Sequence, residues 1–186
     1  MTPEEVLALL RERGALLSGH FLLTSGRHSD TYVEKARILE HPDDVDRLAA
    51  VIARHFHVVD VVVSPAVGAI PLGFAVARAV GARFLFAERE GDRMTLRRGF
   101  RLEPGQRVLV VEDVVTTGGS AAQVVELVEA AGAELAGVAA LVDRSTSPPR
   151  FPLTALVRVE AGAHDPDACP MCDEGMPLQA HGSRYL

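Results

Sequence analysis

The sequence predicts an α/β fold with a central, mostly parallel sheet flanked by helices. Short apolar runs typical of buried strands alternate with helical patterns along most of the 186 residues. The composition agrees, because 48% of the residues are apolar and only 5% are aromatic, which suits parallel strands covered by helices. A chain of this length is expected to form a single domain over 1–186.

The predicted elements follow in order along the chain. Thr2-Pro3-Glu4-Glu5 is a capping box with proline at the first helical position, which predicts a helix to about Arg13. Residues 20–24 and 31–39 look extended, with a turn at 25–30 between them. The later pattern predicts helices at 42–56, 68–80 and 121–131, and strands at 58–63, 83–87, 108–111, 135–142 and 153–159. Residues 88–101 are too polar and too rich in glycine for the core. Residues 1–40 and 162–186 are expected as an N-terminal segment and a C-terminal tail around this core.

Charge and hydropathy exclude several classes of protein. The net charge of −6 and the lack of a long basic run argue against nucleic acid as a partner. The N-terminus lacks a basic region followed by an apolar core, and no apolar stretch approaches the roughly 18–20 residues of a membrane span. With two cysteines, disulfides are not the basis of the fold. We therefore expect a cytoplasmic protein with no membrane partner.

The most informative segment is 107–120. An apolar run ends in Glu112 and Asp113, and a helical pattern begins after the segment. Between the acids and the helix stand Val114, Val115, Thr116, Thr117, Gly118, Gly119 and Ser120. Backbone N–H groups of such a turn, beside a helix N-terminus, suit a phosphate dianion. The two acids can accept hydrogen bonds from ribose hydroxyls. The spacing excludes a Walker A loop and a dinucleotide fingerprint, so we expect a site for a sugar phosphate.

This segment resembles the phosphoribosyl-diphosphate signature of the type I phosphoribosyltransferases. The block from His20 to Ser29 resembles the Phe-x-Leu-x-Ser-Gly-Arg-x-Ser block of the orotate phosphoribosyltransferases, and Leu141-Val142-Asp143-Arg144 is a second match to that family. The resemblance covers about residues 16–145. It implies the type I fold, in which 1–40 forms a hood on the acceptor side and 88–101 forms a mobile lid loop.

The resemblance also implies the site residues. Phosphoribosyl diphosphate would be bound by 112–120, Ala66, Val67 and Arg89. Orotate would be bound by Thr116, Arg144, Ser25, Gly26 and Arg27. A guanidinium such as that of Arg144 is a good donor for the orotate carboxylate.

The implied reaction joins orotate to the phosphoribosyl group and releases pyrophosphate, with Asp113, Arg89 and Arg93 as catalytic residues. Magnesium would be held through the substrate diphosphate, with no direct protein ligand. In the family a mobile loop brings Lys, Arg and His to the diphosphate, commonly across a homodimer interface. Residues 88–101 contain neither Lys nor His, so Arg89 is assigned to the family's arginine and Arg93 to its lysine. Val67 and Thr24 also stand where many relatives place Lys.

Two alternative functions remain open. The chain could transfer phosphoribosyl to a purine base, or it could be a non-catalytic regulator that senses phosphoribosyl diphosphate. The acidic balance and the absence of a helix–turn–helix pattern argue against the regulator.

The tail contains Cys169 and Cys172. One Cys-x-x-Cys supplies two ligands where zinc usually takes four, so two reduced cysteines in a turn are expected. His164 and His181 are the alternative partners for a metal. Of the other histidines, His28 lies in the expected substrate loop.

Overall fold

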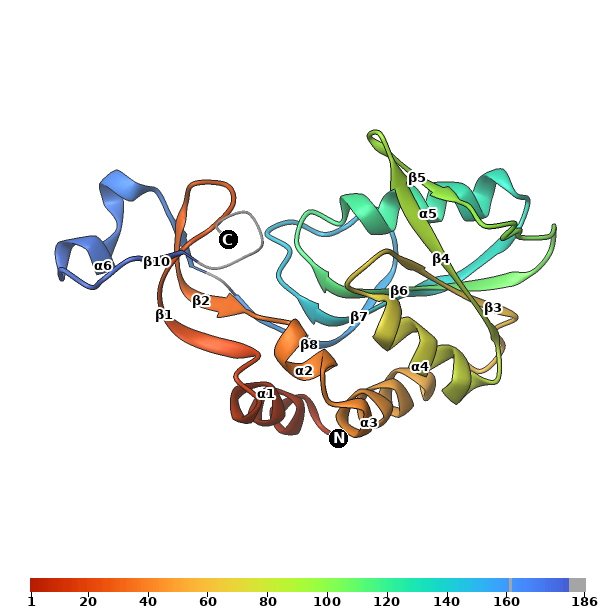
Figure 1. The fold of residues 1–186 in the computed structure, drawn as a ribbon, viewed down its shortest axis with the longest axis horizontal. Coiled ribbons are helices and arrows are strands. Elements are labelled where there is room, and N and C mark those ends of the chain that lie inside the picture. The colour runs from red at the N-terminus through yellow and green to blue at the C-terminus, as the bar shows by residue number, and fades with distance from the viewer. Residues whose placement is uncertain (161, 181–186) are drawn as a thin grey trace.

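The computed structural model describes residues 1–160 and 162–180. It contains a large twisted sheet with helices on both faces and a smaller sheet beside it, as Figure 1 shows. The smaller sheet is built from segments near the beginning and the end of the chain. From here on, the hood means residues 16–35 together with 162–180. Among the described helices, none is long and apolar enough to cross a membrane.

The large sheet has six strands in the order β5-β4-β3-β6-β7-β8. Every neighbouring pair is parallel except β4 and β5, which form an antiparallel hairpin. This confirms the predicted α/β class. The strands are β3 (Val61–Pro65), β4 (Arg83–Glu90), β5 (Arg93–Leu96), β6 (Arg107–Val115), β7 (Glu134–Asp143) and β8 (Leu153–Arg158).

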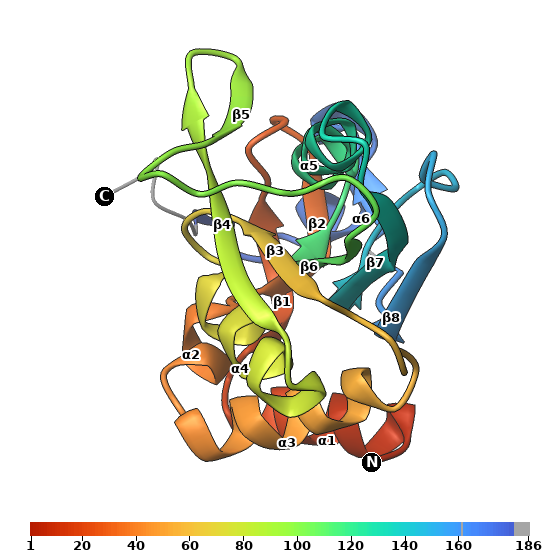
Figure 2. The same ribbon diagram turned by 90° about the vertical axis from the view of Figure 1, so that its right-hand side faces the viewer.

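Helices cover the large sheet on both faces, which explains the long apolar runs of its central strands. One face is covered by α1 (Pro3–Glu12), α3 (Pro42–Ala53) and α4 (Ile70–Val80), and the other by α5 (Gly119–Ala130). Figure 2 shows α5 and the helices α1, α3 and α4 on opposite sides. The predicted capping box is present, because Thr2 Oγ1 accepts from Glu5 N and Thr2 N donates to Glu5 Oε2.

Segments near both ends of the chain contribute strands to the hood. Strands β1 (Leu16–Leu22) and β2 (His28–Val33) form an antiparallel hairpin. The tail adds two short edge strands in the order β10-β1-β2-β9, namely β9 (Ala163–His164) and β10 (Gln179–Ala180). Between these edge strands lie a 3-10 turn (Pro166–Ala168) and the short helix α6 (Pro170–Asp173).

The structure corrects several predictions. Strand β6 continues through Val115, because Glu112 and Val114 pair with Ala140 and Val142 of β7, so both acids lie within the strand. Residues 36–39, expected to be extended, form the helix α2 (Ala36–Leu39). The prediction that 88–101 stays out of the core is wrong at Met94, which is buried against α5.

Candidate active site

The turn between β6 and α5 leaves backbone donors available to a ligand. Gly118 is the N-cap residue of α5 and has a φ of 73°, a conformation that favours glycine. A Cβ at Gly118 would also lie 3.2 Å from Cζ of Phe151. Gly118 has no side chain to cap α5, and the Thr117 hydroxyl makes one long contact there, accepting from Gly119 N over 3.4 Å. The N–H groups that follow Gly119 in the first turn are therefore available to an anion, and the helix dipole favours negative charge there.

A small cavity lies inside this turn. Its volume is about 60 Å³, and it is lined by Glu112, Val114, Val115, Thr116, Thr117, Gly118, Gly119 and Ser120. At roughly 10–15 Å³ for each water-sized occupant, it holds about as many heavy atoms as one phosphate group. The structure thus places all but one of the residues 112–120 around a single phosphate-sized space.

Asp113, the residue of this segment outside the cavity, is held by a cation that the sequence analysis missed. Its side chain is 2% exposed, and Oδ1 accepts a hydrogen bond of 2.6 Å from Val114 N. The other oxygen, Oδ2, lies 2.6 Å from Nζ of Lys35. Lys35 follows β2 and therefore brings the hood to the edge of the large sheet. It keeps 44% of its side chain exposed, so it remains accessible to a ligand.

Glu112 is buried without a comparable cation. Its Oε1 accepts a hydrogen bond of 3.1 Å from Asp113 N. Burial, reinforced by the neighbouring Asp113 carboxylate, raises the pKa of Glu112 from 4.5 to about 8. The free protein therefore holds Glu112 mainly as the neutral acid at pH 7.

The Glu112→Gln variant is expected to flatten the pH dependence of stability. In the wild type, folding raises this pKa, so the stabilisation is fully present below about pH 4.5 and is lost as the pH rises through about 8. Between the two pKa values the free energy of unfolding should fall by up to about 1.4 kcal/mol per pH unit from this group. Urea unfolding at pH 5, 7 and 9 measures the slope. An equal slope in the variant would assign the pH dependence to other groups.

The loop after β3 lies against the same acidic residue. A Cβ at Gly68 would lie 2.3 Å from Asp113 Oδ2 and 2.7 Å from Lys35 Nζ, so the loop approaches the ion pair as closely as glycine allows. The peptide bond between Ala66 and Val67 is cis, and the Val67 side chain is 78% exposed. The predicted diphosphate-binding residues Ala66 and Val67 thus directly precede the glycine that lies against Asp113, and their only polar atoms are those of the backbone.

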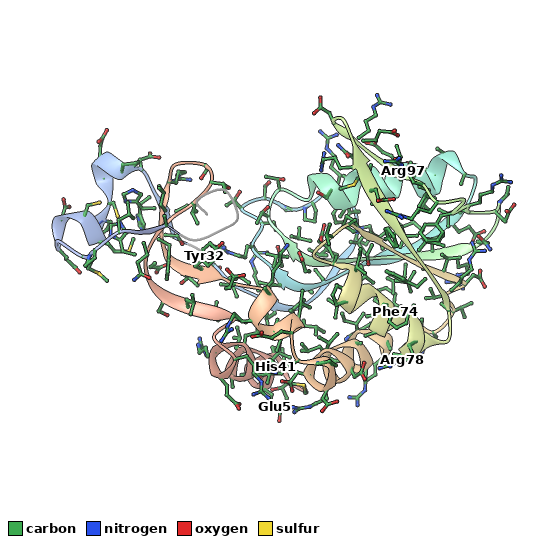
Figure 3. The ribbon with its side chains drawn as sticks, in the orientation of Figure 1. Glu5, Tyr32, His41, Phe74, Arg78 and Arg97 are labelled. Atoms are coloured by element: carbon green, nitrogen blue, oxygen red, sulfur yellow. The ribbon has the colours of Figure 1, made fainter. Side chains whose placement is uncertain are left out.

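Arg144 is a second cation at this edge of the sheet. Its backbone N–H donates to Val115 O over 2.8 Å, which joins the end of β7 to the end of β6. Nη2 donates to Thr31 O over 3.3 Å, whereas Nε is buried and has no hydrogen-bond partner among the described residues. Burial lowers the pKa of Arg144, and Tyr32 and Asp30 partly oppose that effect. Tyr32 lies where the hood approaches the large sheet (Figure 3).

We call residues 116–120, from the end of β6 into the first turn of α5, the phosphate turn. Of the two predicted lid arginines, Arg89 reaches this turn. Its Nη2 donates to Ser120 Oγ over 3.4 Å. Arg93 is exposed on the β4–β5 hairpin, and within 1–160 and 162–180 no hydrogen bond or ion pair joins it to 112–120. The hairpin, on which Figure 3 labels Arg97, stands beside α5. There Gln123 Oε1 accepts from Met94 N over 2.9 Å, and Gln123 Nε2 donates to Asp92 O over 3.0 Å.

Ser25, Gly26 and Arg27 form the exposed turn between β1 and β2. Arg27 contacts the tail, because its Nε lies 3.2 Å from Asp165 Oδ1 and its Nη2 donates to Ala163 O. The structure therefore does not bring Arg27 together with Arg144. The hood meets the site through Thr31 and Lys35 instead.

Comparison with known proteins identifies the family of the chain. Residues 34–152 match the phosphoribosyl transferase domain family. The orotate phosphoribosyltransferase of Desulforamulus reducens is 46% identical over 190 residues, and the alignment covers 100% of both chains. The chain belongs to the orotate phosphoribosyltransferase family. Another member, the orotate phosphoribosyltransferase of Pelotomaculum thermopropionicum, is 48% identical over 190 residues with the same coverage.

Solved structures of orotate phosphoribosyltransferases share the fold. That of Aeropyrum pernix superimposes with a TM-score of 0.70 at 25% identity, covering 83% of this chain and 93% of its own. That of Mycobacterium tuberculosis in complex with inorganic phosphate gives 0.63 at 29% identity, covering 84% and 95%. An adenine phosphoribosyltransferase of Thermoanaerobacter pseudethanolicus gives 0.62 at 16% identity, covering 69% and 88%, which shows the fold alone.

Proposed function

We propose that this chain transfers the phosphoribosyl group of 5-phosphoribosyl 1-diphosphate to orotate, giving orotidine 5′-monophosphate and pyrophosphate. The observation that carries the choice of acceptor is the buried Nε of Arg144, which has no hydrogen-bond partner among the described residues and lies beside the phosphate turn. A buried guanidinium donor without a partner is costly unless a ligand completes it. The carboxylate of orotate matches this donor in charge and geometry.

The reaction requires support for opposite charges at the two ends of the breaking bond. Positive charge develops on the ribose and negative charge on the departing diphosphate. The turn 116–120 would hold the 5′-phosphate with its backbone N–H groups. Asp113 would stabilise the positively charged sugar from a nearly dry position. Lys35 and Arg89, which already reach Asp113 and Ser120, would offset the charge of the diphosphate.

Magnesium fits the donor set of this site. Asp113 offers carboxylate oxygens, the hard ligands that magnesium prefers, although a diphosphate supplies most of its coordination. When bound, the ion would neutralise charge on the leaving group. We propose that the ion is held mainly through the substrate and that the Asp113 carboxylate contributes its field.

The proposal includes a homodimer and a cytoplasmic location. Arg93 is exposed at the hairpin and makes no described contact with its own phosphate turn, so a neighbouring subunit is a suitable recipient of this side chain. Both substrates are small anions that do not readily cross a bilayer unaided, which favours a reaction in the cytoplasm.

A turnover assay with the purified protein tests the proposed function. We expect magnesium-dependent consumption of orotate in the presence of phosphoribosyl diphosphate, and growth of a uracil-requiring strain that lacks this activity. Adenine, hypoxanthine and guanine should be inactive. Turnover of a purine would reassign the acceptor. Tight donor binding without turnover of any base would indicate the regulator instead.

The Arg93→Ala variant is expected to lower kcat at least tenfold while changing the KM for orotate less than threefold. A cation that acts on the leaving diphosphate matters mainly in the transition state. Steady-state kinetics check this, with Arg97→Ala on the same hairpin as the matched control. Equal losses in kcat and orotate affinity would assign Arg93 to substrate binding.

Mixing two inactive variants tests sharing between subunits. Subunits carrying Arg93→Ala, mixed with subunits carrying Asp113→Asn, should regain part of the activity if the hairpin serves the neighbouring subunit. Continued inactivity after demonstrated subunit exchange would mean that the hairpin acts within its own chain.

A further inference from the structure

The hood contains a cluster of four metal-ligating side chains that the proposed reaction does not use. His20 lies in β1, His28 begins β2, and Cys169 and Cys172 flank the first turn of α6. One ligand atom from each of the four lies within 4.8 Å of every other. Both cysteines are free thiols, and all but Cys172 are buried. We call these four residues the His-Cys cluster.

The distances within the His-Cys cluster match a tetrahedral metal centre. Zinc bonds of about 2.0–2.1 Å to nitrogen and about 2.3 Å to sulfur, at tetrahedral angles, place two nitrogens roughly 3.3 Å apart and a nitrogen and a sulfur roughly 3.6 Å apart. His20 Nε2 lies 2.9 Å from His28 Nδ1, 3.6 Å from Cys169 Sγ and 3.8 Å from Cys172 Sγ. Cys172 Sγ lies 3.3 Å from His28 Nδ1. A metal ion would need only small movements of these atoms.

A hydrogen bond outside the cluster orients one of the ligands. The Nδ1 atom of His20 lies 2.9 Å from the backbone oxygen of Met176. A carbonyl can only accept, so Nδ1 carries the hydrogen and the lone pair of Nε2 faces the thiols. A second-shell carbonyl of this kind is the usual partner of a metal-bound histidine.

Few apolar contacts hold the tail in place. In 162–180, Cys169 and Met171 are the buried residues, and the edge strands β9 and β10 contain two residues each. So small an apolar contact rarely fixes a segment of this length, and small structures of this kind usually need a disulfide or a metal. The tail nevertheless covers both edges of the β1–β2 hairpin.

We propose that His20, His28, Cys169 and Cys172 form a structural zinc site that fastens the C-terminal tail to the β1–β2 hairpin. Two imidazoles and two thiolates fill all four positions of zinc and leave none for a substrate, which is typical of a structural centre. This proposal differs from the expectation of two reduced cysteines in a turn. His164, the alternative ligand considered from the sequence, lies in β9 outside the cluster, and His181 lies outside the described residues.

The test uses the full-length protein and does not depend on its activity. We expect about one zinc per chain by plasma mass spectrometry after dialysis. Protein reconstituted with Co²⁺ should show the intense visible bands of a tetrahedral ion and a thiolate-to-metal charge-transfer band. A strong chelator should lower the Tm by at least about 5 °C, because loss of a ligand bound only to the folded state removes its stabilisation.

The informative variant is Cys172→Ser, since Cys172 is the exposed member and its replacement disturbs the core least. It should bind less than a tenth of the wild-type zinc, and its Tm should not respond to the chelator. His164→Ala and the exposed His57→Ala are controls that should retain the metal. Absence of zinc from the wild type, together with no uptake of Zn²⁺ at micromolar concentration, would overturn the proposal. A Cys169–Cys172 disulfide in protein purified under reducing conditions, or full zinc retention by Cys172→Ser, would overturn it equally.

Discussion

Replacing Asp113 with asparagine is expected to lower kcat for orotate at least tenfold while leaving the fold intact. The amide keeps the shape of the carboxylate but removes the negative charge that faces Lys35 Nζ at 2.6 Å. That charge would stabilise the positively charged sugar in the transition state, in a position that is nearly free of water. A tenfold loss corresponds to about 1.4 kcal/mol of transition-state stabilisation. Steady-state and single-turnover kinetics measure the effect.

The control is Asp43→Asn, which removes an exposed carboxylate from the first turn of α3. It should turn over as fast as the wild type. Circular dichroism and the Tm of both variants establish that each is folded. Wild-type kinetics in folded Asp113→Asn would show that the carboxylate does not contribute to the chemical step.

Replacing Arg144 with glutamine is expected to raise the KM for orotate at least tenfold and to change the KM for phosphoribosyl diphosphate less than twofold. The variant removes the buried Nε donor that has no described partner. It should not destabilise the free protein greatly. Among the described residues, the guanidinium makes one long hydrogen bond, to Thr31 O, and burial lowers the pKa of Arg144. Kinetics with each substrate varied in turn separate the two constants.

Arg150→Gln is the matched control, since Arg150 is exposed in the loop before β8. Arg144→Lys should recover only part of the affinity, because an ammonium cannot form the paired hydrogen bonds of a guanidinium with a carboxylate. Equal increases in both KM values would show that Arg144 affects the site as a whole and not orotate binding in particular.

The local structure of the turn after β6 could be predicted from the sequence because its residues are contiguous, whereas phosphate binding there stays a prediction. Glu112 to Ser120 share one strand–turn–helix unit, in which local geometry determines both the left-handed Gly118 and the direction of the first N–H groups of α5. The parallel sheet was equally predictable, because apolar strands that alternate with helices form few stable arrangements other than a parallel sheet covered by helices. The end of β6 was not, because its last residues are fixed by pairing with β7 and not by their own pattern.

Residues joined by the fold alone escaped the sequence analysis. Lys35 stands far from Asp113 in the chain and carries no local signal of their ion pair. His20 is separated from Cys169 by 149 positions, so the histidines nearest to Cys169 and Cys172 in sequence were considered first. Arg27 matched a family pattern, yet the tail that it contacts could not be foreseen from that pattern.

Helix α5 begins at the turn proposed to bind the donor phosphate and also carries the β4–β5 hairpin. Two hydrogen bonds with Gln123, the hydrogen bond from Arg89 to Ser120 and the burial of Met94 hold the hairpin there. Releasing them costs about 3–7.5 kcal/mol, from roughly 0.5–1.5 kcal/mol for each of the three hydrogen bonds and about 1.5–3 kcal/mol for the methionine. Their release leaves the pairing of β3 with β4 through Ala87 in place. In the proposed reaction, a nucleotide product would be bound at the N-terminus of α5. The contacts that hold the β4–β5 hairpin would lie on the same helix.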